Sequence, residues 1–236
     1  MSVLIVKNIT REGPGLLQEL LDQHNIPYHI VDLDKGELFP DPHRYKAVVV
    51  LGGPDSANDT TPKMQQELQS IREIVKAKIP YLGACLGMQT LIKANEGEIY
   101  RNPIKELGWR DPDDEFFTIE LTSEGRADPL FNGLESKLKI FHLHGETVKL
   151  SPNMVLLATG KYCLVQAVRV GSNAYGYQGH FELTPEMFET WITRDSDLIP
   201  LDREALRKDY ALIRQEYEAT GRQILTNWLQ IANLVK

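Results

Sequence analysis

Cys85 lies between two glycines, at the point where an apolar run ends and a helix-like run begins, in the segment IPYLGACLGMQ. A strand–turn–helix bend that presents a nucleophile needs small neighbours, because the bend is sharp and the nucleophile is strained. The pattern of residues 83–87, GACLG, therefore predicts a cysteine nucleophile at such an elbow. The helix N-terminus would favour the thiolate, and the N–H of Leu86 would face a developing oxyanion. The alternative is a buried small residue in a glycine-lined turn.

Two further segments could complete a thiol-based site. Gly53 follows an apolar run in VVVLGGPDS, where its free N–H could be a second oxyanion donor; such a string by itself is typical of a plain turn. His180 and Glu182 are two residues apart, and in an extended segment such side chains point to the same side. A thiolate needs a histidine, and the histidine needs an orienting carboxylate. Each signal has a structural alternative, but their combination in one chain favours catalysis.

The elements that must position these residues alternate between strand and helix over the first hundred residues. Residues 3–6 form a continuous apolar run that indicates a strand buried on both faces, and leucines at helical spacing follow in residues 13–25. Thr61 is a suitable N-cap for a helix over residues 61–78, with an apolar stripe of Met64, Leu68, Ile71 and Val75. This alternation predicts a parallel sheet with helices on both faces, because each crossover helix covers one face.

The second half of the chain has a different pattern of predicted strands and helices. From Gly97 onward, short strand candidates are separated by turn residues, and beyond Pro185 the pattern is helical through Lys236. We therefore predict an α/β fold of the flavodoxin-like type, an open and mostly parallel sheet with helices on both faces. The predicted domain covers residues 1–190, and residues 191–236 form a helical C-terminal extension of the same domain. The extension could cap the sheet, cover the site or form an oligomer face.

The amino-acid composition and the net charge indicate which partners and which cellular location to expect. The chain has 236 residues, of which 42% are hydrophobic and 25% charged, as in ordinary globular proteins. A net charge of −7 without a basic cluster argues against a nucleic-acid partner. The start MSVLIVKNIT reads as a strand and not as a signal peptide, and no apolar stretch is long enough to span a bilayer. Two cysteines are too few for a disulfide framework, which predicts a reducing, cytoplasmic location.

The chain resembles the class I, triad-type glutamine amidotransferases. Four segments carry the resemblance: GGP at 52–54, GACLGMQ at 83–89, HGETV at 144–148 and YGYQGHFE at 175–182. It is most similar to stand-alone members, which are related to the glutaminase domain of GMP synthetase and to γ-glutamyl peptidases. Phe181 stands where family members usually have proline, and Gly179 before the histidine is typical of the stand-alone relatives and of γ-glutamyl peptidases.

The resemblance implies a role for ten residues. The catalytic triad would be Cys85, His180 and Glu182, and the oxyanion hole would consist of the N–H groups of Gly53 and Leu86. The residues implied in substrate binding are Gly52, Gln89, Leu143, His144 and Gly145. No cofactor and no metal are expected. His142 and His144 in FHLHG could suggest zinc, but we interpret them as a packed strand histidine and a backbone position of the substrate pocket.

The implied reaction is hydrolysis of the side-chain amide of glutamine through a γ-glutamyl thioester on Cys85, with release of ammonia and glutamate. Two alternatives stay open. A γ-glutamyl peptide hydrolase would use the same triad with a larger leaving amine, and a binding or regulatory relative would not be catalytic. The expected partners are glutamine or a γ-glutamyl compound and, for an ammonia donor, a separate synthetase or other ammonia acceptor. Neither a nucleic acid nor a membrane is expected as a partner, and a homo-oligomer stays open.

Overall fold

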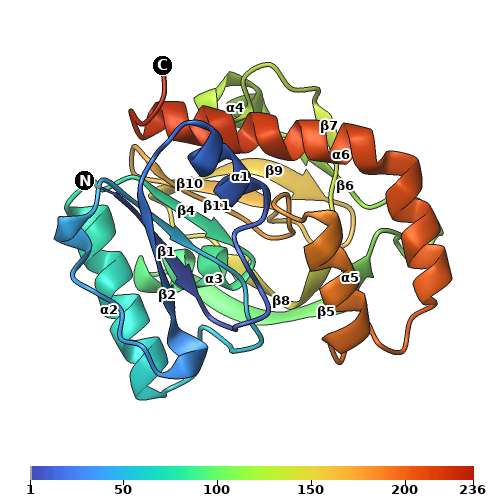
Figure 1. The fold of residues 1–236 in the computed structure, drawn as a ribbon, viewed down its shortest axis with the longest axis horizontal. Coiled ribbons are helices and arrows are strands. Elements are labelled where there is room, and N and C mark those ends of the chain that lie inside the picture. The colour runs from blue at the N-terminus through green and yellow to red at the C-terminus, as the bar shows by residue number, and fades with distance from the viewer. Residues whose placement is uncertain (1) are drawn as a thin grey trace.

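The computed structural model describes residues 2–236, and its centre is a nine-stranded sheet of order β2-β1-β3-β4-β11-β10-β9-β6-β7 (Figure 1). The first five strands in this order are parallel to one another. They are β2 (Tyr28–Asp32), β1 (Val3–Lys7), β3 (Ala47–Val50), β4 (Tyr81–Ala84) and β11 (Ala174–Tyr177). The expectation of an open α/β sheet is confirmed, and β4, which precedes Cys85, lies in the middle of it.

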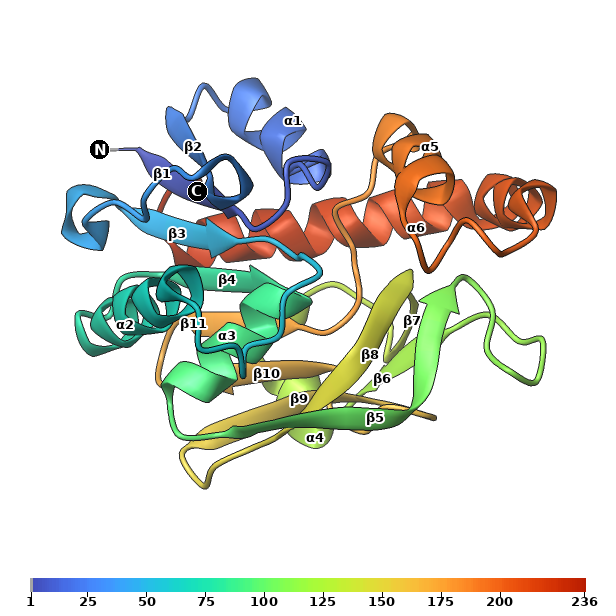
Figure 2. The same ribbon diagram turned by 90° about the horizontal axis from the view of Figure 1, so that it is seen from below.

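The other half of the sheet is antiparallel. It consists of β10 (Ala167–Val170), β9 (Met154–Gly160), β6 (Thr118–Leu121) and β7 (Lys137–Lys139). A separate antiparallel pair of β5 (Glu98–Gly108) and β8 (His142–Lys149) crosses beside the sheet, next to the helix that follows Cys85 (Figure 2). The short helix α4 (Ser123–Ala127) and three 3₁₀ turns, Leu33–Lys35, Pro42–Arg44 and Pro129–Phe131, complete the connections.

Helices cover both faces of the sheet, as expected from the strand–helix alternation (Figure 1). On one face lie α1 (Leu16–Gln23), α5 (Pro185–Arg194) and α6 (Arg203–Ile231), and on the other lie α2 (Pro62–Lys76) and α3 (Leu86–Ala94). Successive residues of β1 therefore enter opposite cores, with Val3 and Ile5 in one and Leu4 and Val6 in the other. Within residues 2–236, no helix combines the length and the apolar character that a membrane crossing requires.

Helix α2 begins as predicted, but its buried face differs slightly from the predicted apolar stripe. The Thr61 hydroxyl accepts a hydrogen bond from the N–H of Met64 at 3.2 Å, and Pro62 is the first helical residue. Ile74 is buried, whereas Val75, which we expected in the stripe, is only partly buried. Val75 still packs against the same core as the rest of the stripe, and Ile74 joins them because positions 71 and 74, three residues apart, lie on one side of the helix.

The sequence analysis did not predict β5. Its eleven residues include Pro103, and only Ile99, Asn102, Glu106 and Gly108 are buried, so the period-2 apolar signal of a strand is weak. The structure accommodates the proline at an irregularity in the pairing with β8, where the register shifts between Arg101 and Glu106. A proline is tolerated at such a bulge because no ladder hydrogen bond is needed there.

The C-terminal residues form one long helix, α6, that lies along the sheet (Figure 1). Its buried side chains include Leu206, Tyr210, Ile213, Tyr217 and Trp228, which belong to the same core as α1 and α5. Ile231, which we expected in the second stripe, is only partly buried. Of the roles considered, the helix covers one face of the sheet. The boundary at residue 190 remains a prediction.

A buried carboxyl group on α2 is expected to make stability depend on pH. Glu67 is fully buried, accepts one hydrogen bond of 3.3 Å from Asn8, and leaves Oε2 without a partner among the described residues. Burial raises its pKa from 4.5 to about 7, so the folded chain holds a proton that the unfolded chain has released. This group's contribution to stability therefore falls as the pH rises from 4.5 to about 7 and is constant above that.

We expect Glu67→Gln to raise the free energy of unfolding at about pH 8, by about 3 kcal/mol, and to change it much less at about pH 5. Urea unfolding at the two pH values measures this, with the exposed Glu135→Gln as the matched control. An equal change at both pH values would contradict the proposed burial of a titrating carboxyl group.

Candidate active site

The backbone at Cys85 has the geometry of an elbow between β4 and α3. Cys85 has φ 51° and ψ −107°, a conformation that is strained for any residue other than glycine. A Cβ on Gly83 would lie 2.4 Å from the carbonyl carbon of Gly87, and a Cβ on Gly87 would lie 2.1 Å from the carbonyl oxygen of Val50. Both glycines are therefore required by close packing around the bend.

His180 and Glu182 follow the end of β11, the strand next to β4. The N–H of Cys85 donates to the carbonyl of Tyr177 at 2.9 Å, which ties the elbow to the end of β11. His180 Nδ1 lies 2.7 Å from Glu182 Oε1, and the N–H of Phe181 donates to Glu182 Oε2 at 3.0 Å. Both side chains are buried, so this charge-assisted contact is shielded from water.

The surroundings of His180 favour its protonated form. Burial by itself lowers the pKa of His180, but the negative charge of Glu182 and hydrogen bonds to Cys85 and Glu182 outweigh it, and the pKa lies well above its usual value. An imidazolium beside a cysteine can stabilise a thiolate and can later give its proton to a leaving group.

Helix α6 packs against residues 180–183, the histidine segment, and forms hydrogen bonds with its backbone. The Tyr217 hydroxyl donates to the carbonyl of His180 at 3.0 Å and accepts from the N–H of Leu183 at 3.2 Å. Gly221 allows the helix to approach closely, because a Cβ there would lie 2.1 Å from the carbonyl oxygen of Phe181. The Trp191 ring contacts the His180 ring edge to face at 4.7 Å between centroids. Helix α6, through Tyr217 and Gly221, and helix α5, through Trp191, therefore pack against the segment that carries the two predicted catalytic side chains.

Two cavities meet at Cys85. The first, the Gln89 cavity, has a volume of about 290 Å³. Of the residues predicted for substrate binding, Gln89, Leu143, His144 and Gly145 line it together with Cys85. Gly52 does not line it; a Cβ on Gly52 would instead lie 3.5 Å from the Cβ of Cys85 and 3.1 Å from Cε1 of His180. Gly52 thus lies behind the reacting groups, where only a residue without a side chain fits.

The second cavity, the Glu12 cavity, lies on the His180 side of Cys85 and has a volume of about 350 Å³. The residues that line both cavities are Gly53, Pro54, Cys85, Lys105, Leu143 and Asp197. The charged or ionisable side chains that line the second cavity are Arg11, Glu12, Lys105, His180, Asp195 and Asp197.

The predicted oxyanion donors lie at the junction of the cavities. Gly53 lines both, and Leu86 is the first residue of α3, whose N–H points away from the helix. Within residues 2–236, neither N–H has a hydrogen-bond partner. A Cβ on Gly53 would lie 3.5 Å from Cδ2 of Leu86, so the two residues are neighbours across the elbow.

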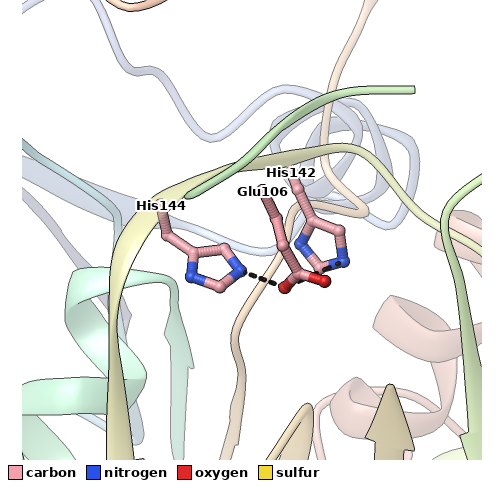
Figure 3. A group of neighbouring side chains, drawn as sticks. All are labelled: Glu106, His142 and His144. Carbon is pink, nitrogen blue, oxygen red and sulfur yellow. Dashed lines mark ion pairs between the residues drawn. The ribbon is translucent and has the colours of Figure 1, made fainter. Parts of the chain in front are cut away.

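The two histidines of FHLHG meet a carboxylate that sequence analysis did not single out (Figure 3). His144 Nε2 lies 2.7 Å from Glu106 Oε2, without the alignment of a hydrogen bond, and His142 Nε2 lies 3.9 Å from the same oxygen. Glu106 also accepts from Gln166 at 3.1 Å, and His144 Nδ1 is 3.0 Å from the carbonyl of Glu146. These donor types suit zinc, but the contacts already present join β5 to β8, and we interpret them as a buried polar network.

We expect metal removal to leave this protein unchanged. Prolonged dialysis against a strong chelator should not lower the melting temperature, because Glu106 already contacts Gln166 and His144. Thermal unfolding before and after dialysis, with zinc added back, measures this. A melting temperature that falls on dialysis and recovers with zinc would show that the three residues hold an ion.

Sequence analysis missed several residues of the site. Glu12 follows β1, and Lys105, Asp195 and Asp197 come from β5 and the segment after α5. One signal was available for Glu12, since the carboxyl ends of parallel strands meet at one edge of the sheet. The polar segment after the first strand, Asn8 to Glu12, therefore had to lie near Cys85.

The fold and this site define an open-sheet α/β protein with a cysteine elbow on a central strand and a histidine–glutamate pair on the next one. The model of the family "Glutamine amidotransferase class-I" matches residues 16–197. The chain belongs to this family.

Curated relatives match about two thirds of the chain. The chain is 30% identical over 155 residues to the glutamine amidotransferase-like protein YfeJ of Salmonella typhimurium, a match that covers 64% of this chain and 62% of that protein. It is 30% identical over 159 residues to a subunit of the glutamine-hydrolysing GMP synthase of Ignicoccus hospitalis, covering 66% and 73%. It spans only 26% of the length of a GMP synthase of Borrelia garinii, to which it is 28% identical over 151 residues.

Two solved structures share nearly the whole fold. A glutamine amidotransferase of Methylobacillus flagellatus is 25% identical with a TM-score of 0.84, covering 98% of this chain and 94% of that one. A glutamine amidotransferase of Thermotoga maritima is 26% identical with a TM-score of 0.86, covering 98% of each.

Proposed function

We propose that the chain hydrolyses the side-chain amide of glutamine, with Cys85 as nucleophile, His180 as acid and base, and Glu182 as the group that orients His180. The observation that carries this proposal is the junction of a strained cysteine elbow with a buried histidine that Glu182 and Cys85 hold protonated. The N–H groups of Gly53 and Leu86, which have no hydrogen-bond partner among residues 2–236, lie next to Cys85 and support its assignment by offering two donors to an oxyanion.

The steps follow from these positions. The Cys85 thiolate attacks the amide carbon, and the negative charge that develops on the oxygen is stabilised by the N–H groups of Gly53 and Leu86. His180 gives its proton to the amide nitrogen, the C–N bond breaks, and ammonia leaves a γ-glutamyl thioester on Cys85. Neutral His180 then takes a proton from water, hydroxide adds to the thioester, and glutamate leaves as the thiolate and the imidazolium are restored.

The Gln89 cavity offers charges for the amino-acid end of glutamine. Arg101 could bind the α-carboxylate, and Glu146 could bind the α-ammonium group. The Gln89 amide is fixed by contacts of 3.3 Å to the carbonyl of Glu146 and to Gln178, so it is pre-positioned at the cavity wall. This supports the predicted binding residues near Leu143, His144 and Gly145.

Two relatives bear on how the ammonia is used. One is the subunit of the glutamine-hydrolysing GMP synthase described above, and the other is subunit HisH of the imidazole glycerol phosphate synthase of Moorella thermoacetica, 26% identical over 185 residues. By analogy, this chain either passes ammonia to a separate synthetase or acts alone.

Release of glutamate and ammonia from glutamine by the purified chain tests the proposal. We expect slow but measurable turnover that disappears in Cys85→Ala. If the chain alone is inactive and becomes active when a synthetase is added, the hypothesis that it acts alone is excluded, and the hypothesis that it donates ammonia to a synthetase is supported. If Cys85 also reacts no faster than an ordinary thiol with an alkylating agent near neutral pH, the binding or regulatory alternative is favoured.

A γ-glutamyl amide with a larger leaving amine is the second candidate substrate. The Glu12 cavity, at about 350 Å³, far exceeds what ammonia needs, since a water molecule of similar size occupies roughly 30 Å³. A panel of γ-glutamyl amides assayed beside glutamine distinguishes the two candidates.

A further inference from the structure

Among the described residues, Glu12 is the one acid lining its cavity that has no basic partner there. The other acids are neutralised, because Arg11 Nη2 lies 2.5 Å from Asp195 Oδ2 and Lys105 Nζ lies 2.7 Å from Asp197 Oδ1. Within residues 2–236, Glu12 forms no ion pair. Because the imidazolium of His180 is paired with Glu182, an ionised Glu12 is the one acid lining the cavity whose charge has no ion-pair partner among the described residues.

Glu12 is also buried without a hydrogen-bond partner for one oxygen. Glu12 is only 4% exposed, and its Oε2 has no hydrogen-bond partner within the described residues. Such a group is costly unless something binds it. A buried, unpaired carboxyl group that lines a cleft beside a reacting centre is therefore a candidate for ligand binding.

The free oxygen lies beside the reacting groups. A Cβ built on Gly52 would lie 2.4 Å from Glu12 Oε2, 3.1 Å from His180 Cε1 and 3.5 Å from the Cβ of Cys85. Three side chains from different parts of the chain thus surround one point. Because His180 must protonate the leaving nitrogen, the substituent on that nitrogen would extend toward the Glu12 side of the cavity junction.

We propose that the Glu12 cavity is the subsite for the leaving amine, and that Glu12 makes it selective for γ-glutamyl amides whose leaving amine carries a second, protonated amino group. A cationic group would satisfy the free carboxylate, a neutral amine would leave it unpaired, and a carboxylate-bearing amine would be repelled. This inference rests on the proposed function and names the substrate class of the same site.

The ionisation of Glu12 gives the selectivity a dependence on pH. The pKa of Glu12 is raised from 4.5 to about 7, chiefly by burial; of the nearby charges, those of His180 and Arg11 lower it and those of Glu182 and Asp195 raise it. Glu12 is therefore increasingly ionised as the pH rises through 7, and the preference for a cationic leaving amine is expected to increase over the same range.

Three substrates whose leaving amines each have three carbons test the inference: the γ-glutamyl amides of diaminopropane, propylamine and β-alanine, which end in a cation, a methyl group and an anion. We expect kcat/KM to fall in that order, with about a tenfold advantage of the diamine over propylamine, as for a charged hydrogen bond. Glu12→Gln is expected to bring this ratio close to one, and the exposed Glu135→Gln is expected to keep it.

The outcomes separate this inference from the proposed function. If wild-type protein, alone or with a synthetase, hydrolyses neither glutamine nor any γ-glutamyl amide, the proposed function fails. If it hydrolyses glutamine or the propylamide but shows no preference for the diamine, or if Glu12→Gln keeps the preference, the inference is overturned. A wild-type preference that does not change between about pH 6 and pH 8 overturns the role of Glu12 without any variant.

Discussion

Replacing Cys85 by alanine is expected to lower glutamine hydrolysis by at least about a thousandfold while leaving the fold intact. The thiolate forms the covalent bond to the substrate, and no other group described at the junction of the two cavities can replace it. Because Cys85 has φ 51°, Cys85→Gly is expected to be equally inactive but more stable than Cys85→Ala, by about 1 kcal/mol. Glutamate release and thermal unfolding measure both effects.

Cys163 is the matched control for this experiment. It is fully buried, its sulfur lies 3.0 Å from the Thr147 hydroxyl, and burial raises its pKa to about 11. It therefore remains a thiol at neutral pH, and Cys163→Ala is expected to keep most activity at a stability cost of about 1 kcal/mol. If Cys163→Ala were inactive and Cys85→Ala active, Cys163 and not Cys85 would be the nucleophile. A glutamine-like diazo-ketone is expected to add mass to the peptide that contains Cys85.

Replacing His180 by alanine is expected to cost nearly as much as losing Cys85, because His180 moves a proton in both half-reactions. Glu182→Gln is expected to retain more activity. Glu182 touches no reacting atom in the proposed steps; it positions the ring through the 2.7 Å contact and keeps it protonated. The double variant is expected to be little worse than His180→Ala, since groups that act as a unit are not additive.

A second readout separates positioning from mere stability. Without the negative charge of Glu182, burial is expected to dominate and the pKa of His180 to fall. The alkylation rate of Cys85 near neutral pH is then expected to fall in both Glu182→Gln and His180→Ala, because a neutral imidazole no longer stabilises the thiolate. Wild-type rates of turnover and alkylation in Glu182→Gln would refute the assigned role.

The parts of the site that depend on neighbours in the sequence were predictable. The elbow at Cys85 follows from packing between residues a few positions apart, since Gly83 and Gly87 must both lack a side chain. His180 and Glu182 contact each other because they are two residues apart. The N-cap at Thr61 is similarly local. Such contacts are set by backbone geometry over a few bonds, whatever the rest of the chain does.

Tertiary structure alone decided the remainder. Glu12 reaches the site because β1 and β3 are neighbours in the sheet, and Lys105 reaches it because β5 pairs with a strand about forty residues away. The long helix α6 could have covered the site or a partner; instead Tyr217 and Gly221 place it against the histidine segment. Nothing in local spacing selects among these arrangements, because they depend on which apolar faces bury one another. The sequence by itself therefore determined the bend at Cys85 and the contact between His180 and Glu182, and the packing of distant elements decided the cavities around them.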